Sequence, residues 1–218
     1  MTLSARRRAT VRDATCADPF AEAIDMVMPA TVPPARWTRA MLEALPEDGQ
    51  RHEIIDGVHY VTPSPGSPHQ LVLGELYVLL HAYVRREPVG WLLLSPWDVD
   101  LGNDTVVEPD IVVVPRTGPR PPDAGTPGVV PLLAIEIISP SSVSRDRIVK
   151  RRRYQRAAIA EYWIVDPNSR LIERWMAADE RPEIITEMLR WSPAGSNAAL
   201  EVDVTSLFAD LLPDDELA

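Results

Sequence analysis

Two acidic residues lie inside or beside apolar runs that predict buried strands. Asp110 directly precedes the run Ile111–Val114, and Glu136 lies within the run Leu132–Ile138. Runs rich in valine, isoleucine and leucine indicate strands that are covered on both faces. An ionised carboxylate in such a strand is costly unless a cation or hydrogen bonds compensate its charge. A metal ion shared by Asp110 and Glu136 would satisfy both side chains.

The lone lysine of the chain follows these two acids. The sequence contains 22 lysine and arginine residues, of which only Lys150 is lysine, so 22 − 1 = 21 are arginines. A lysine ammonium is compact and can lose its proton, whereas arginine stays charged. Lys150 and Tyr154 share a helical face, which predicts that Lys150 points towards the sheet. In the alternative, Lys150 forms an ordinary surface pair with Asp146, worth about 0.3–0.5 kcal/mol.

The order of these residues resembles the PD-(D/E)XK nuclease superfamily. Pro109-Asp110 lies on one predicted strand, Glu136 lies on the next, and a lysine follows. The standard pattern places that lysine two residues after the second acid, where this chain has Ile138. The role of the lysine would therefore pass to Lys150 on the following helix.

A set of short motifs narrows the resemblance to the Uma-two family of restriction endonucleases. No single motif is specific, but their common order is, and the resemblance spans residues 37–175. The motifs are Arg51-His52-Glu53-Ile54-Ile55-Asp56-Gly57, Ser95-Pro96-Trp97-Asp98-Val99, Glu108-Pro109-Asp110, Glu136-Ile137-Ile138-Ser139-Pro140-Ser141, Lys150 with Tyr154, and Glu161-Tyr162-Trp163-Ile164-Val165-Asp166-Pro167.

The resemblance implies metal-dependent hydrolysis of phosphodiester bonds in DNA, with Mg²⁺ as the cofactor and Mn²⁺ as a substitute. Asp110 and Glu136 would hold the ion with the help of the backbone carbonyl of Ile137, since Mg²⁺ prefers oxygen ligands. Lys150 would orient the attacking water or help to take its proton. Glu53 would be an additional catalytic acid, and in the alternative it is a rim carboxylate on an edge hairpin.

Two other classes of function remain open. An inactive nuclease scaffold that binds nucleic acid or protein is favoured by Ile138, at the standard position of the lysine, and by the acidic composition. In a purely structural interaction module, an arginine would neutralise Glu136 instead of a metal ion. The sequence gives no target sequence, no preference for DNA over RNA and no oligomeric state, so a homodimer is left open.

Composition limits the class of protein. The net charge of −10 argues against a protein that coats nucleic acid. Residues 145–156 hold seven basic residues and one acid, 7 − 1 = +6, and this basic helix could meet a phosphate backbone. The alternative is a solvated helix that pairs with neighbouring acids. The single cysteine, Cys16, excludes an internal disulfide framework. No apolar run approaches the roughly 18 residues of a membrane helix, so a cytoplasmic protein without membrane contact is expected.

We expect an α/β fold to position these residues. The resemblance implies a restriction-endonuclease-like central mixed sheet flanked by helices, with additional antiparallel strands. Residues 36–212 are expected to form this domain, between a flexible arm (residues 1–35) and an acidic tail (residues 213–218). His69 to Arg86 predicts an amphipathic helix that packs on the sheet. His69, at the start of this helix, is interpreted as a cap or a surface residue rather than as a ligand of phosphate or metal.

Smaller elements complete the prediction. Asp56-Gly57 predicts a hairpin turn. Trp97 to Leu101 and Ile184 to Trp191 predict strands. Thr38 and Thr205 are expected to cap helices.

Overall fold

The computed structural model of the protein describes residues 36–102, 104–140 and 142–212. The predicted arm, residues 1–35, and the predicted acidic tail, residues 213–218, lie outside the described residues, and their boundaries stay predictions. Within the described residues, no helix is long and apolar enough to cross a membrane.

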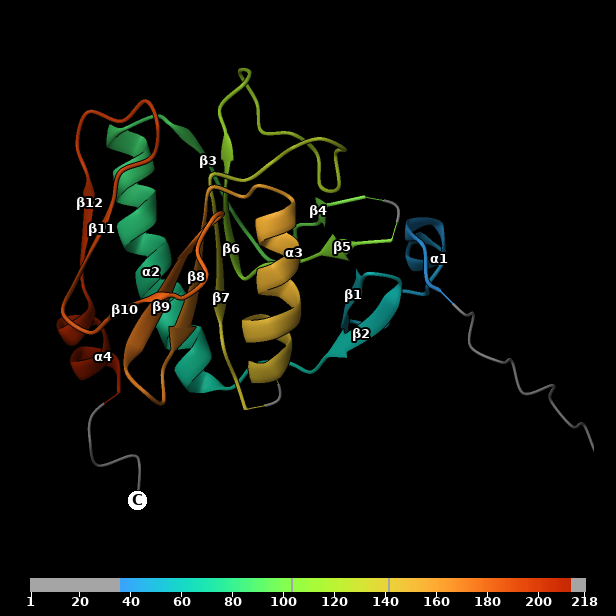
Figure 1. Ribbon diagram of the computed structural model, residues 1–218, viewed down its shortest axis with the longest axis horizontal. Coiled ribbons are helices and arrows are strands. Elements are labelled where there is room, and N and C mark those ends of the chain that lie inside the picture. Colours follow the sequence, from blue (N-terminus) through green and yellow to red (C-terminus); the bar gives the residue numbers. More distant parts are fainter. Residues whose placement is uncertain (1–35, 103, 141, 213–218) are drawn as a thin grey trace, which may run out of the picture. The chain divides into compact units, whose positions relative to one another are not determined.

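A six-stranded mixed sheet is the centre of the fold (Figure 1). In the order in which they hydrogen-bond, its strands are β10 (Glu183–Ile185), β9 (Leu171–Met176), β8 (Glu161–Asp166), β7 (Leu133–Ile137), β6 (Ile111–Pro115) and β3 (Gly90–Leu94). β7 and β8 run parallel, and the other neighbours run antiparallel. A parallel pair needs a connection that crosses over the sheet. This crossover carries the π-helix η1 (Arg145–Lys150) and α3 (Arg151–Arg156).

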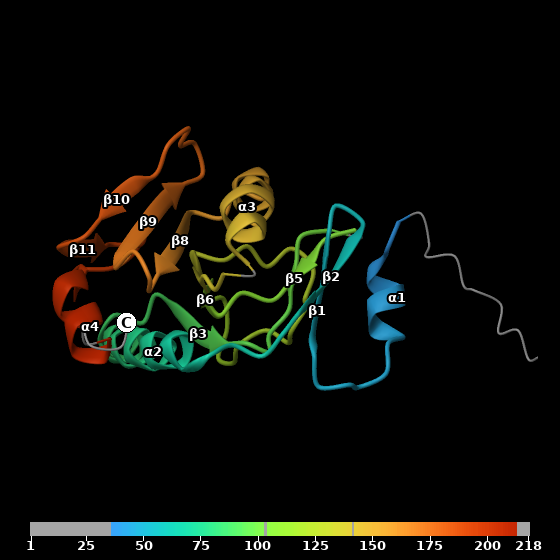
Figure 2. The ribbon, with the colours of Figure 1, turned by 90° about the horizontal axis from the view of Figure 1, so that it is seen from below.

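Helices cover both faces of this sheet, and Figure 2 shows α3 on one side and α2 (Ser67–Arg86) on the other. Successive side chains of a strand point to opposite faces. Ile111 therefore belongs to the same apolar core as Leu80 of α2, whereas Val112 belongs to a second core with Tyr154 of α3. The mixed α/β fold and the sheet-packed amphipathic helix predicted from the sequence are confirmed.

Two smaller antiparallel sheets complete the domain. The four-stranded sheet has the order β2 (Val58–Thr62), β1 (Arg51–Ile55), β5 (Val106–Val107), β4 (Val99–Asp100), and the two-stranded sheet pairs β11 (Met188–Trp191) with β12 (Leu200–Asp203). The remaining helices are α1 (Arg39–Glu43) and α4 (Val204–Leu211). Asp56 and Gly57 join β1 to β2 with φ angles of 51° and 80°. Positive φ at both positions is what a type I′ hairpin turn requires, so the predicted hairpin is confirmed.

Both predicted helix caps are wrong in detail. Thr38 precedes α1, but its side chain makes no capping hydrogen bond. α4 is capped by Asp203, whose carboxylate accepts from the backbone N–H of Ser206. The hydroxyl of Thr205 instead donates to the carbonyl of Thr186.

Two strand predictions are too long. Trp97 to Leu101 contributes only the two-residue strand β4, because just this part pairs with β5. The predicted strand from Ile184 to Trp191 is interrupted after Ile185 and resumes at Met188. Its two halves belong to different sheets, so the chain has to change direction between them.

Truncation of a side chain on the buried face of α2 should destabilise the fold. Leu80 of α2 is fully buried in the core against the sheet. Leu80→Ala should lower the free energy of unfolding by about 2–5 kcal/mol, because it removes buried methyl groups and leaves a cavity. Val78→Ala on the same helix, where Val78 is 57% exposed, should change it by less than about 0.5 kcal/mol. Urea denaturation measures both, and equal losses would contradict the assignment of the buried face.

Candidate active site

The ammonium of Lys150 is the centre of a buried cluster of charges. Its Nζ lies 2.6 Å from Oε1 of Glu53 and 2.7 Å from Oε1 of Glu136. The hydroxyl of Tyr154 donates to the same oxygen of Glu136 at 3.0 Å. Lys150 and Glu53 are fully buried, and Glu136 is 1% exposed. Three of the predicted site residues are thus in direct contact.

Separate elements bring these groups together. Glu136 faces α3 because it alternates along β7 with Ile135, which belongs to the α2 core. The crossover passes over that face, and Lys150 is the last residue of η1. Short π-helices have wider turns than α-helices and are frequent at functional sites. Glu53 comes from β1, where its Oε1 also accepts from the backbone N–H of Glu108 at 2.8 Å.

The geometry overturns two of the alternatives from the sequence. Lys150 and Asp146 are both buried, so they are not an ordinary surface pair. Glu53 is not a rim carboxylate, although it lies on a hairpin, because the strand turns its side chain inward. A protein cation does pair with Glu136, as the structural-module alternative expected, but it is Lys150 and not an arginine. Ile138, at the standard position of the lysine, is instead 4% exposed and belongs to the α3 core.

Asp110 has its own set of partners. Its Oδ2 accepts from the backbone N–H of Ile137 at 2.8 Å and lies 3.1 Å from Nε2 of His69. Its Oδ1 accepts from Nη1 of Arg51 at 2.7 Å. Arg51 and Glu53 are two residues apart on β1, so their side chains point to the same face. β1 therefore connects Asp110 to the Lys150 cluster.

Burial and neighbouring charges shift the pKa values of the cluster in opposite directions. Burial raises the pKa of Glu136, and the attraction to Lys150 offsets only part of this effect. Burial also opposes the charge of Glu53, but the attraction to Lys150 and Arg51 outweighs it and lowers the pKa of Glu53. The two carboxylates outweigh the burial of Lys150 and raise its pKa above the ordinary lysine value. The two carboxylates therefore favour the charged form of Lys150, whose Nζ donates to Glu136 at 2.7 Å.

Asp110 stays ionised although it is buried. Burial by itself raises the pKa of this carboxyl, but the hydrogen bond with His69 and the charge of Arg51 lower it to about 2. A buried carboxylate that keeps its charge needs cations or strong donors around it. The surroundings of Asp110 provide both.

A cavity of about 530 Å³ opens beside Asp110. It lies between the starts of α2, β1 and β6 and the end of β7, and its lining includes Arg51, His69, Glu108, Asp110 and Ile137. Its volume is in the range of pockets that hold small ligands. The residues of the Lys150 cluster do not line it, so Asp110 is the predicted site acid that faces the open space.

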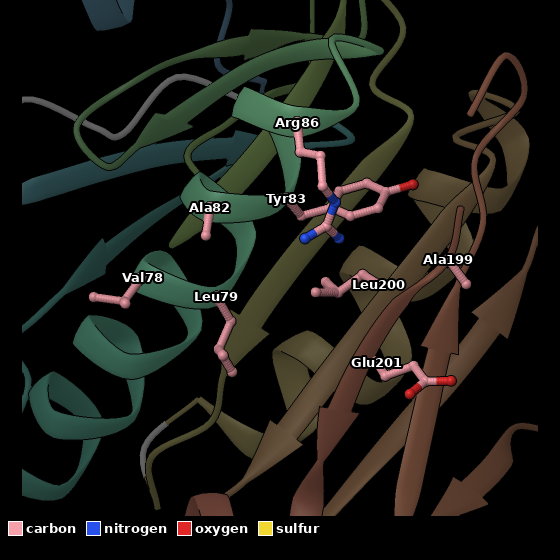
Figure 3. A pocket seen from close by; sticks show the side chains of 8 residues that line it. All are labelled: Val78, Leu79, Ala82, Tyr83, Arg86, Ala199, Leu200 and Glu201. Carbon is pink, nitrogen blue, oxygen red and sulfur yellow. The ribbon is translucent and has the colours of Figure 1, made fainter. Parts of the chain in front are cut away.

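A second cavity, of about 360 Å³, lies between α2 and β12 (Figure 3). Its lining is mostly apolar, and Figure 3 shows Leu79 and Leu200 at this place with Arg86 and Glu201 as its charged residues. None of the predicted site residues lines it. Of the two cavities, only the first therefore has a predicted site residue, Asp110, in its lining.

The sequence prediction missed or misplaced three residues that line the first cavity, beside Asp110. His69 was expected as a cap or a surface residue, but it is 8% exposed and contacts Asp110. Arg51 was passed over, although it lies two residues before Glu53 on the same strand. Glu108, two residues before Asp110, accepts from the hydroxyl of Ser95 at 2.6 Å, and burial raises its pKa. Arg51 and Glu108 could have been found from the sequence, because each lies two residues before a predicted site acid and side chains two residues apart in a strand point to the same face.

Most basic residues of the crossover serve the fold. Arg147 pairs with Asp166 and Glu173. Three other arginines also have partners. Arg145 and Arg151 each lie against an aromatic ring, and Arg145 also lies close to an acid. Arg153 donates to a backbone carbonyl. Arg152 and Arg156 are the exposed ones in this segment. The alternative interpretation, a helix that pairs with neighbouring acids, therefore describes the segment better than a free basic surface.

The implied metal ion can be tested against the residues present. Carboxylate and carbonyl oxygens from Asp110, Glu136 and Ile137 are the hard ligands that Mg²⁺ prefers, and Oε2 of Glu53 is buried without a hydrogen-bond partner. The chemistry of these groups fits a divalent ion. Both implied carboxylates, however, already pair with a protein cation. Over the described ranges, no three histidine, cysteine, aspartate or glutamate side chains are grouped to hold a metal ion. A divalent ion at Asp110 would therefore share this carboxylate with Arg51 or displace the guanidinium.

The buried cluster yields a second expected outcome. Lys150→Met should cost about 3–5 kcal/mol of stability, because it leaves two buried carboxylates without their cation. The triple variant Glu53→Gln, Lys150→Met, Glu136→Gln removes all three charges and should recover most of that loss. Thermal and urea unfolding of both variants measure the difference. A triple variant as unstable as Lys150→Met would show that packing, and not charge, sets the cost.

Comparisons with known proteins identify the family of the chain. Residues 39–204 match the sequence model of the Uma2 family, described as "Putative restriction endonuclease". No curated protein matches the chain. A crystal structure from Anabaena variabilis, described as "a putative nuclease belonging to DUF820", is similar in fold, with a TM-score of 0.69 and 21% identity over 81% of this chain and 99% of that chain. The family match covers most of the chain, and the protein belongs to the Uma2 family.

Proposed function

We propose that the protein is a metal-dependent endonuclease that hydrolyses phosphodiester bonds in DNA. The observation that carries this proposal is the lysine buried between two carboxylates, directly connected through β1 to an ionised aspartate that faces a cavity. Buried ion pairs seldom improve stability over apolar packing, so their presence is better explained by chemistry. Membership of a family described as restriction endonucleases supports the same class of reaction.

Each residue then has a defined task. Asp110 faces the cavity and would hold Mg²⁺ together with Glu136 and the carbonyl of Ile137. When bound, Mg²⁺ supplies Lewis acidity towards the phosphate and activates a water molecule for attack. Lys150 keeps Glu136 in place and adds a fixed positive charge near the charge that develops in the reaction. Its raised pKa favours this orienting role over the alternative of taking a proton. Glu53 holds Lys150 from the other side.

A binding module on an inactive nuclease scaffold is the second candidate. Two observations favour it: Ile138 replaces the standard lysine in the core, and both implied metal ligands already hold protein cations. This candidate shares the metal site and the nucleic acid but not the cleavage step. It therefore differs from the first candidate only in the outcome of a cleavage assay.

A plasmid-nicking assay tests the proposed hydrolysis. The wild type should nick supercoiled DNA with Mg²⁺ or Mn²⁺ and should stop when EDTA is added, because the activated water is lost. Asp110→Asn should fold and lose the activity. Glu201→Gln, at an exposed side chain in the second cavity, should cut like the wild type.

The same assay separates the two candidates. A wild type that binds Mn²⁺ and DNA but never cuts is the inactive scaffold. Cleavage that survives in both Asp110→Asn and EDTA would place the reaction outside this site. A parallel time course with RNA of the same sequence determines the preferred nucleic acid.

A further inference from the structure

Among the described residues, Arg51 is the one lysine or arginine that lines the site cavity. Its Nη1 donates to Oδ1 of Asp110 at 2.7 Å, and its side chain is 18% exposed. A guanidinium has five N–H donors in a planar fork. Among the described residues, Asp110 is its hydrogen-bonding partner, and its Nε is buried without one. Most of the hydrogen-bonding capacity of Arg51 is therefore unused in this arrangement.

The two oxygens of Asp110 differ in what holds them. Oδ2 is fixed by the backbone N–H of Ile137 and by Nε2 of His69. Oδ1 is held by the guanidinium of Arg51 alone. A backbone N–H on a central strand cannot leave, whereas a long arginine side chain can rotate into the adjacent cavity. A divalent ion that binds Asp110 therefore competes with Arg51 for Oδ1.

The displaced guanidinium would remain in the cavity. The acidic residues of the lining are Glu47, Glu108 and Asp110, and His69 also lines the cavity. A phosphodiester that enters such an acidic cavity needs a cation beside the metal ion. Arginine suits this task, because its fork forms two parallel hydrogen bonds with phosphate oxygens.

We propose that Arg51 is the substrate-phosphate ligand of this site and that it is held on Asp110 until a divalent ion takes its place. The inference rests on the proposed function, because it needs a phosphodiester substrate and a metal ion. It makes the binding of metal and of DNA cooperative, since the ion frees the residue that the phosphate requires. Without the ion, Arg51 neutralises Asp110 and is withheld from DNA.

Metal binding gives the first test. Mn²⁺ affinity is measured by calorimetry on the wild type, Arg51→Gln and Arg51→Lys. Arg51→Gln should bind Mn²⁺ about tenfold more tightly than the wild type, because the competing cation is gone. Arg51→Lys keeps a competing charge and should bind Mn²⁺ like the wild type. Equal or weaker binding by Arg51→Gln overturns the proposal.

DNA binding gives the second test, in which the same substitution should weaken binding instead of strengthening it. Binding of a short fluorescent DNA oligonucleotide is measured by anisotropy, with Ca²⁺ as the ion and with EDTA as the ion-free control. Arg51→Gln should bind DNA at least about tenfold more weakly than the wild type in Ca²⁺, because a charge-assisted bond to phosphate is lost. Arg190→Gln, at a side chain that is 70% exposed, should bind DNA like the wild type. Unchanged DNA affinity in Arg51→Gln overturns the proposal.

The pair of measurements excludes a purely structural role for Arg51. A structural role would weaken both bindings together, whereas the proposal requires Mn²⁺ affinity to rise while DNA affinity falls.

If Arg51→Gln does not fold, the side-chain N–H signal of Arg51 is followed by NMR in the unmodified chain during a Mg²⁺ titration. Release from Asp110 should shift this signal and speed its exchange with water, and a signal unchanged at Mg²⁺ saturation overturns the proposal. A wild type that shows this exchange but never cleaves DNA refutes the proposed hydrolysis and leaves the role of Arg51 intact.

Discussion

The ammonium of Lys150 compensates two carboxylates in a region that water does not reach, and the rest of the site depends on this compensation. Glu53, Glu136 and Lys150 come from β1, β7 and η1, so one cluster of charges holds together a small sheet, the central sheet and the crossover. Attraction between charges is strong in a medium of low polarity, but so is the cost of removing them from water. The arrangement is therefore stable only as a complete set, and each member constrains the position of the other two.

Asp110 connects this closed cluster to the open cavity. Its carboxylate is held by β7 through Ile137, by α2 through His69 and by β1 through Arg51. Arg51 and Glu53 alternate on β1, so one strand presents a cation to Asp110 and an anion to Lys150. The site thus has a fixed interior, where one ammonium holds two carboxylates, and an outer part, where one pairing can be exchanged. This division explains how acids that are mutually repulsive can lie close together before any ligand arrives.

Local sequence patterns predicted the parts of the site that lie within single elements. The apolar runs around Asp110 and Glu136 gave their strands, and helical spacing with Tyr154 gave the direction of Lys150. Contacts between distant segments were beyond such patterns. Nothing near His69 indicates that it meets Asp110, because that contact depends on where α2 packs. The two-residue strands β4 and β5 are too short for any periodicity, so the small sheet that delivers Glu53 was not predictable.

The crossover between β7 and β8 separates the place of a residue in the chain from its place in space. Parallel strands oblige the chain to pass over one face of the sheet, and here that is the face towards which Glu136 points. A lysine at any position of the crossover whose side chain reaches Glu136 can supply an ammonium to it. Residue 138, which directly follows β7, can then be apolar and pack in the core, because Lys150 on the crossover supplies the positive charge. A search by linear spacing would overlook this pairing, whereas a search for an amine within reach of the buried acid in space finds Lys150.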